Sequence, residues 1–72
     1  MAKYIIKNNV PSGEITKAEY NNAKEAKRHF LDIVSLLSKA YSTKVFLRTK
    51  PLRGTIQVEI DGFYYYVELD KE

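Results

Sequence analysis

The spacing of apolar residues predicts one long helix in the first half of the chain. Thr16 and Glu19 have the spacing of a capping box, in which the side chains bond free backbone N–H groups at a helix start. Ile15 and Tyr20 stand at the two positions of a hydrophobic staple. Beyond them, apolar residues recur at steps of three and four: Ala23, Ala26, Phe30, Ile33, Val34, Leu37 and Tyr41. We therefore expect an amphipathic helix over residues 16–41.

After this helix the apolar period changes to two, which is typical of half-buried strands. The alternation predicts strands over residues 45–50, 55–60 and 63–69. Residues 51–54, Pro-Leu-Arg-Gly, predict a turn between the first two strands, because Pro fixes φ and Gly tolerates unusual backbone angles. Asp61-Gly62 is a preferred dipeptide of the two-residue type I′ turn, so the last two strands should form a hairpin.

The predicted hairpin fixes which side chains share a face of the sheet. A two-residue loop sets the register, and the pairs on one face are then Ile60–Phe63, Val58–Tyr65 and Ile56–Val67. The apolar stripe of the helix must be buried, and this face is the surface able to receive it. The sequence therefore predicts two layers, with the helix packed on one face of the sheet.

A short apolar segment near the N-terminus, residues 3–7, predicts one further strand, and several turn formers follow it in residues 8–15. The sequence does not decide whether this strand lies beside the 45–50 strand or beside the 63–69 strand. Parallel pairing through a right-handed crossover is the default expectation. The predicted fold is thus α+β: a single two-layer domain over residues 1–72 with order βαβββ, in which the helix packs on an antiparallel three-stranded meander plus the N-terminal strand.

Composition limits the chemistry available to this chain. It has 72 residues, no cysteine and one histidine, which excludes disulfides, thiol nucleophiles and His-rich metal sites. Its three glycines are isolated from one another, so the sequence has no glycine-rich phosphate-binding loop. A domain this short also has little room to enclose a ligand pocket. We expect no cofactor, no metal and no small-molecule substrate.

His29 is the candidate for general acid–base chemistry. Asp32 and Glu25 lie three and four residues away on the predicted helix and are the carboxylates that could pair with it. Catalysis by a histidine needs a nucleophile as well as an orienting carboxylate within hydrogen-bond reach. A histidine–carboxylate pair on one helix is far more often a surface contact, so we predict that the protein is not an enzyme.

Charge is unevenly distributed along the chain. The net charge is +3, but residues 1–53 hold 11 of the 12 basic residues and 4 of the 9 acidic ones, whereas residues 54–72 hold one base and five acids. A basic end and an acidic end can steer an anionic partner or align copies head to tail; a solvated surface with chance asymmetry is the alternative. No segment has the apolar length of a signal peptide or membrane span, and the chain contains no cysteine, so we expect a cytoplasmic protein without membrane contact.

The side of the sheet turned away from the helix is the best candidate for a binding surface. If Val45 and Leu47 face the helix, this side carries aromatic rings interleaved with cations and an amide: Phe46, Arg48, Lys50, Gln57, Tyr64 and Tyr66. Tyr and Arg are the residues that anchor protein interfaces. The first hypothesis is therefore a non-catalytic interaction module that contacts a protein partner or a second copy of this chain.

Two other interpretations of the same side chains stay open. Exposed rings can stack unpaired bases, with Arg48, Lys50 and Arg53 on the phosphates, which would make the domain a binder of single-stranded nucleic acid. Glu59 and Glu68 on the same side count against phosphate binding. Alternatively, the rings do no more than stabilise the sheet through cross-strand pairs.

A second, basic surface is predicted on the outer side of the helix, at Lys17, Lys24, Arg28 and Lys39. It would suit phosphate or an acidic protein partner, and a solvated helix face is the alternative. Leu31 and Leu36 fall on the flanks of the helix, outside the apolar stripe. They either extend the core contact or provide the seed of a dimer.

A helix over residues 16–41 followed by three antiparallel strands resembles the first part of a double-stranded RNA-binding domain. The second helix of that family has no counterpart in the sequence, and the strands contain no glycine–aromatic motif of the RNA-recognition type. In size and α/β character the chain looks like an accessory protein of a bacteriophage or mobile element. That interpretation rests on no motif, and no family is assigned.

Overall fold

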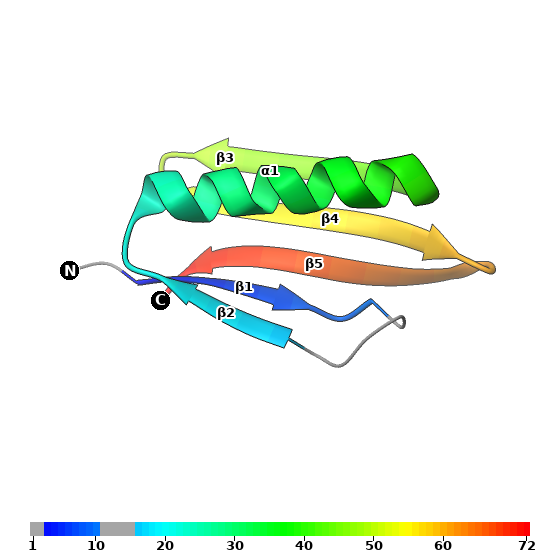
Figure 1. The fold of residues 1–72 in the computed structure, drawn as a ribbon, viewed down its shortest axis with the longest axis horizontal. Coiled ribbons are helices and arrows are strands. Elements are labelled where there is room, and N and C mark those ends of the chain that lie inside the picture. The colour runs from blue at the N-terminus through cyan, green and yellow to red at the C-terminus, as the bar shows by residue number, and fades with distance from the viewer. Residues whose placement is uncertain (1–2, 11–15) are drawn as a thin grey trace.

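The computed structural model describes residues 3–10 and 16–72, in which one helix lies on a five-stranded antiparallel sheet (Figure 1). The elements are β1 (Tyr4–Asn8), β2 (Thr16–Tyr20), α1 (Ala23–Ala40), β3 (Ser42–Thr49), β4 (Leu52–Ile60) and β5 (Phe63–Lys71). Across the sheet the strands follow the order β2-β1-β5-β4-β3. The predicted α+β class, the two layers and the β3-β4-β5 meander are confirmed, and the element order is ββαβββ.

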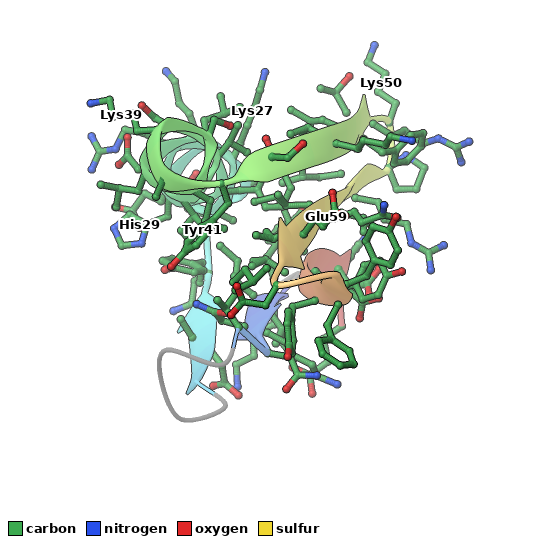
Figure 2. The ribbon with its side chains drawn as sticks, turned by 90° about the vertical axis from the view of Figure 1, so that its right-hand side faces the viewer. Lys27, His29, Lys39, Tyr41, Lys50 and Glu59 are labelled. Carbon is green, nitrogen blue, oxygen red and sulfur yellow. The ribbon has the colours of Figure 1, made fainter. Side chains whose placement is uncertain are left out.

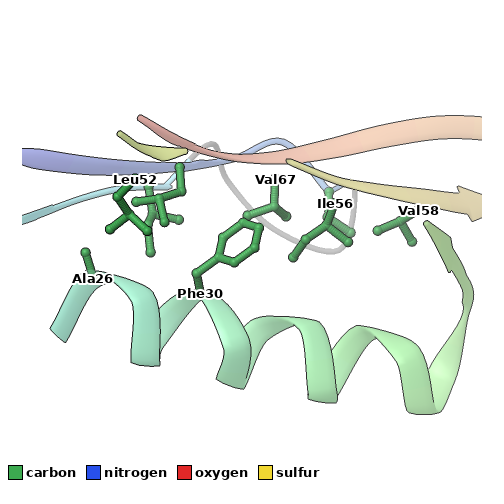
Figure 3. Close-up of a cluster of buried hydrophobic side chains, with 9 residues drawn as sticks. Ala26, Phe30, Leu52, Ile56, Val58 and Val67 are labelled. Carbon is green, nitrogen blue, oxygen red and sulfur yellow. The ribbon is translucent and has the colours of Figure 1, made fainter. Parts of the chain in front are cut away.

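The core lies between α1 and the face of the sheet that curls around it (Figures 2 and 3). It consists of side chains from the helix and from β1, β4 and β5, together with Val10, and the buried members are Ile6, Val10, Ala26, Phe30, Leu52, Ile56, Val58, Val67 and Leu69. Phe30 projects from the middle of α1 into this layer (Figure 3). In the described part of the chain, no element covers the other face of the sheet.

The β4–β5 hairpin has the predicted register. Asp61 and Gly62 have φ of 51° and 83°, because a type I′ turn needs positive φ at both central residues. The observed pairs are those expected: Ile60–Phe63, Val58–Tyr65 and Ile56–Val67. Phe63 nevertheless stays 66% exposed, since the tip of the hairpin extends past the C-terminal end of α1 (Figure 1).

The expected helix start at Thr16 is wrong, because residues 16–20 form β2 and the helix begins at Ala23. The segment pairs with β1 in an antiparallel register that sets Ala18 opposite Ile6. A strand satisfies its backbone against β1, whereas a helix starting here would leave β1 without that partner. Ile15, half of the predicted hydrophobic staple, lies outside the described residues.

Asn22 is the residue that caps the helix. Its side-chain oxygen accepts hydrogen bonds from the backbone N–H groups of Lys24 at 2.8 Å and Glu25 at 3.4 Å. These bonds satisfy two of the N–H groups that have no partner inside the first turn of a helix. Asn22 and Glu25 also have capping-box spacing, so the sequence contained a second start signal beside the one at Thr16.

The N-terminal strand lies between β2 and β5 and is antiparallel to both, so the default of a parallel pairing is wrong. The crossover through α1 leads from β2 to β3, which lie at opposite edges of the sheet. β1 precedes β2 in the chain and pairs with it antiparallel, so the crossover does not start from β1. Of the two neighbours left open by the sequence, the strand that became β5 is the observed one.

The predicted turn over residues 51–54 is displaced in the structure. Lys50 and Pro51, which are joined by a cis peptide bond, form the turn between β3 and β4. Leu52 is already buried in β4, and Gly54 lies inside that strand. A Cβ atom on Gly54 would come within 2.6 Å of Cζ of Phe30. Gly54 therefore makes room for the ring of Phe30 and has no turn role.

Candidate interaction surface

Strand register places five of the six predicted binding residues on the face of the sheet opposite α1, which is called the open face below. Lys44, Gln57 and Tyr66 are cross-strand partners in neighbouring strands. Their chain neighbours Ile56 and Val67 are completely buried against the helix, and successive side chains of a strand point to opposite faces. The same alternation brings five of the six predicted residues to the open face: Phe46, Arg48, Gln57, Tyr64 and Tyr66. Lys50 lies in the turn after β3.

Three aromatic side chains on the open face are half-exposed. The exposed fractions are 52% for Phe46, 56% for Tyr64 and 42% for Tyr66. Tyr64 and Tyr66 are two residues apart on β5, so their Cα atoms are about 7 Å apart along the strand. Phe46 lies two strands away on β3, a lateral separation of about 10 Å. The rings thus frame a strip of the sheet rather than a single cluster.

Shallow hollows lie beside these rings. One of about 190 Å³ is lined by Phe46, Tyr66, Thr55 and Gln57, together with Lys44 and Val45. A neighbouring hollow of about 210 Å³ lies against Tyr64, and Gln57 and Lys44 line both. Each hollow has the size of one or two side chains of a partner, and both are open to solvent. This relief of rings and hollows is suited to side chains inserted from another surface.

Charges of both signs surround the rings. The guanidinium of Arg48 lies 5.9 Å from the centroid of Phe46, within the range of a cation–π contact. Arg53 Nε and Asp70 Oδ1 form an ion pair at 2.9 Å. Glu59 is the cross-strand partner of Tyr64, so a carboxylate stands beside that ring. This mixture of signs suits a protein surface better than a phosphate backbone.

The predicted basic surface on the helix does not form as expected. Lys17 belongs to β2, where it pairs with Lys7, because the helix begins later than predicted. Lys24, Arg28 and Lys39 are exposed on α1. Arg28 and Lys39 are separated by about 16 Å along the helix axis. Lys24 and Arg28, one helical turn apart, line one surface hollow together with Lys27, whereas Lys39 lies far from it, so the three predicted helix cations do not share one site.

Leu31 and Leu36 lie on opposite flanks of α1. Ser38 Oγ and Thr43 Oγ1 of β3 are 2.9 Å apart, which identifies the flank toward β3. Leu31 precedes Ser38 by seven residues, or two helical turns, and shares this flank. Leu36 follows His29 by seven residues and shares the flank that faces β2. The two leucines therefore do not form one apolar patch.

The side chain of His29 hydrogen-bonds to Tyr20 of β2. The Tyr20 hydroxyl bonds Nδ1 of His29, and the two rings meet edge to face with centroids 5.1 Å apart. Burial, with a smaller contribution from the charge of Glu25, raises the pKa of Tyr20. This pair was not predicted, because both residues were expected to lie on one helix over residues 16–41.

Metal-binding and membrane-spanning features are missing from the described residues. Residues 3–10 and 16–72 contain no group of three or more His, Cys, Asp or Glu side chains that could hold a metal ion. Within the same residues, no helix combines the length and the apolar character needed to cross a bilayer.

Comparison with known proteins gives no relative: no protein-family model matches the chain, and no curated protein or solved structure shows significant similarity to it.

Proposed function

We propose that this protein is a non-catalytic interaction module that binds a protein partner through the open face. The observation that carries the proposal is the set of half-exposed rings of Phe46, Tyr64 and Tyr66 on a sheet face that no described element covers. Aromatic side chains in such positions are the usual anchors of protein interfaces. The apolar core lies on the other face of the sheet, and these three rings are not part of it.

The exposed area of the rings gives the scale of the available binding energy. Each ring exposes roughly 100 Å², about half of its full surface. Burying all three would contribute about 7 kcal/mol at ~25 cal/mol per Å². Association itself costs an estimated ~4–15 kcal/mol, so burial of the rings offsets only the lower part of that range. The contacts around the rings must therefore supply the remaining binding free energy. Arg48, Lys44 and Glu59 are positioned to do so and to set the orientation of the partner.

A second copy of this chain is the partner to test first, because a face with charges of both signs can complement itself. The experiment is a measurement of solution mass over a concentration series for the wild type and for Tyr64→Ala/Tyr66→Ala. Phe63→Ala is the matched control, since Phe63 is an exposed ring on the same strand but on the opposite face. Self-association through the open face predicts a dimer that only the double variant converts to a folded monomer.

Binding of single-stranded nucleic acid is the second candidate. It is favoured by Arg48 against the ring of Phe46 and by Lys44 in the same cross-strand row as Tyr66. Repeating the mass series with a mixed-sequence oligonucleotide at low and moderate salt separates the candidates. A gain in mass that salt reverses supports nucleic acid, because phosphate contacts weaken steeply with salt. A dimer that ignores the oligonucleotide supports the protein partner.

A further inference from the structure

We propose that the outer edge of β3 binds an extended acidic segment of a partner protein, which adds to the sheet as a sixth strand. This goes beyond the open-face proposal, because it assigns a function to the backbone edge of one strand. The sheet ends at β3, which pairs with β4 on its other side. Along such an edge, alternate residues direct their N–H and C=O groups away from the sheet, where a further strand can pair with them.

The length of β3 makes it the better of the two edges for strand addition. β3 has eight residues and β2, at the opposite edge, has five. Figure 2 shows β3 at the outer margin of the sheet beside α1. Long edge strands attract other strands unless a protein protects them, and lysine side chains are one common protection. Lys44 and Arg48 on β3 would repel another cationic strand and attract an acidic one.

An added strand would meet an apolar shelf on the helix side of the edge. Val45 is the cross-strand partner of buried Ile56, so it points toward the helix side, yet it is half-exposed at the margin. Leu31 is half-exposed on the flank of α1 that faces β3. The helix and β3 run in opposite directions (Figure 1), and Thr43 is level with Ser38. At ~3.3 Å per strand residue and ~1.5 Å per helical residue, Leu31 is level with the strand just beyond Val45.

The open-face side of the same edge is cationic. Lys44, Phe46 and Arg48 alternate there, and residues 42–50 contain no acidic side chain. Residues on an added strand stand directly opposite those of β3, where opposite charges stabilise the pair and like charges destabilise it. A fitting strand therefore alternates acidic residues on the open-face side with apolar residues on the helix side. A second β3 would bring the same cations together, so a second copy does not fit this edge.

The test uses synthetic peptides of the same length as β3. The probe alternates Glu with Val, and its binding is followed by fluorescence anisotropy and by hydrogen exchange of the backbone amides of the full-length protein. Three control peptides share its length: one alternates Lys with Val, one has Glu and Val in paired blocks, and one carries N-methyl groups on two successive central residues, which blocks both edges of the strand. The protein variants are Lys44→Glu/Arg48→Glu and, as a control, Tyr64→Ala/Tyr66→Ala.

Strand addition predicts that the Glu–Val peptide binds and slows amide exchange at alternate residues of β3, while the three control peptides bind at least about tenfold more weakly. Lys44→Glu/Arg48→Glu should lose the Glu–Val peptide and gain the Lys–Val peptide, which shows that the variant is folded. Tyr64→Ala/Tyr66→Ala should bind as the wild type does, because β5 lies two strands away. Equal binding of the N-methylated peptide, protection outside β3, or no binding of the Glu–Val peptide would each overturn the inference, whatever the mass series shows for the open face.

Discussion

The contact between Gly54 and Phe30 allows a quantitative test of the fold. In Gly54→Ala the new Cβ would lie 2.6 Å from Cζ and 2.8 Å from Cε2 of Phe30, whereas carbon atoms in contact are ~3.5–4.0 Å apart. The ring of Phe30 is completely buried among Ile56, Leu69 and other core side chains. It must therefore move by about 1 Å into occupied space, and overpacking of this kind costs about 1–3 kcal/mol.

That cost is large for a domain of this size. At ~0.05–0.15 kcal/mol per residue, 72 residues give an unfolding free energy of about 4–11 kcal/mol. A loss of 1–3 kcal/mol should lower Tm by roughly 5–20 °C. Urea unfolding followed by circular dichroism measures the loss directly, and an unchanged m value would show that the two-state transition is preserved.

A double-mutant cycle with Phe30→Leu isolates the steric contact. Phe30→Leu alone should destabilise by about 1–2 kcal/mol through lost packing. In that background Gly54→Ala should cost less than about 0.5 kcal/mol or even stabilise, since Ala is favoured over Gly inside a strand. The expected coupling energy is about 1–2 kcal/mol. Equal effects of Gly54→Ala in both backgrounds would refute the proposed role of Gly54.

Three further predictions concern the helix cap, the hairpin turn and the hydrogen bond between Tyr20 of β2 and His29 of α1. Asn22→Ala should destabilise by about 1 kcal/mol and Asn22→Asp should not, measured by urea unfolding, because the cap needs a side-chain oxygen. Gly62→Ala should cost about 1–2 kcal/mol at φ 83°, and equal stability would contradict the type I′ turn. Tyr20→Phe removes the hydroxyl that bonds His29, and it should lower the free energy of unfolding by up to about 1 kcal/mol at neutral pH. Because burial and the charge of Glu25 raise the folded-state pKa of Tyr20 above 10.0, the wild type should lose stability relative to Tyr20→Phe as the pH rises from 10.0 through that folded-state pKa. An unchanged difference between the two proteins over this range would contradict the shift.

The β4–β5 hairpin could be predicted from the sequence because independent local signals agreed there. The Asp61-Gly62 turn and the alternation of Ile56, Val58 and Val67 require the same register, and that register is observed. The side chains of the open face followed from the same alternation, so the positions of Tyr64 and Tyr66 could also be predicted. Local turn chemistry and period were sufficient for both.

The start of the helix could not be predicted in the same way. The segment from Thr16 to Tyr20 carries a capping-box spacing and also the alternation of a strand. Pairing with β1 decides between them, and pairing partners far apart in the chain are not visible in a local pattern. The order of β1, β2 and β5 was out of reach for the same reason.

Gly54 shows another limit of local interpretation. Pro51 and Gly54 lie three residues apart, and a proline followed closely by a glycine is most often found in a turn. Its position is instead explained by the ring of Phe30, which comes from a different element. The exposed edge of β3 likewise follows from the strand order, so neither this edge nor the apolar shelf beside it could be inferred from the sequence.

Site-specific photocrosslinking tests the proposed function most directly. A photoreactive phenylalanine analogue is placed at position 66, on the open face, or at position 63, on the same strand and the opposite face. The protein is then irradiated in its native cells and treated with nuclease. We predict a discrete, nuclease-resistant protein adduct from position 66 and none from position 63, and an adduct of twice the chain's mass would identify a second copy. No adduct from position 66, the same adduct from both positions, or an adduct that nuclease removes would contradict a protein-binding open face.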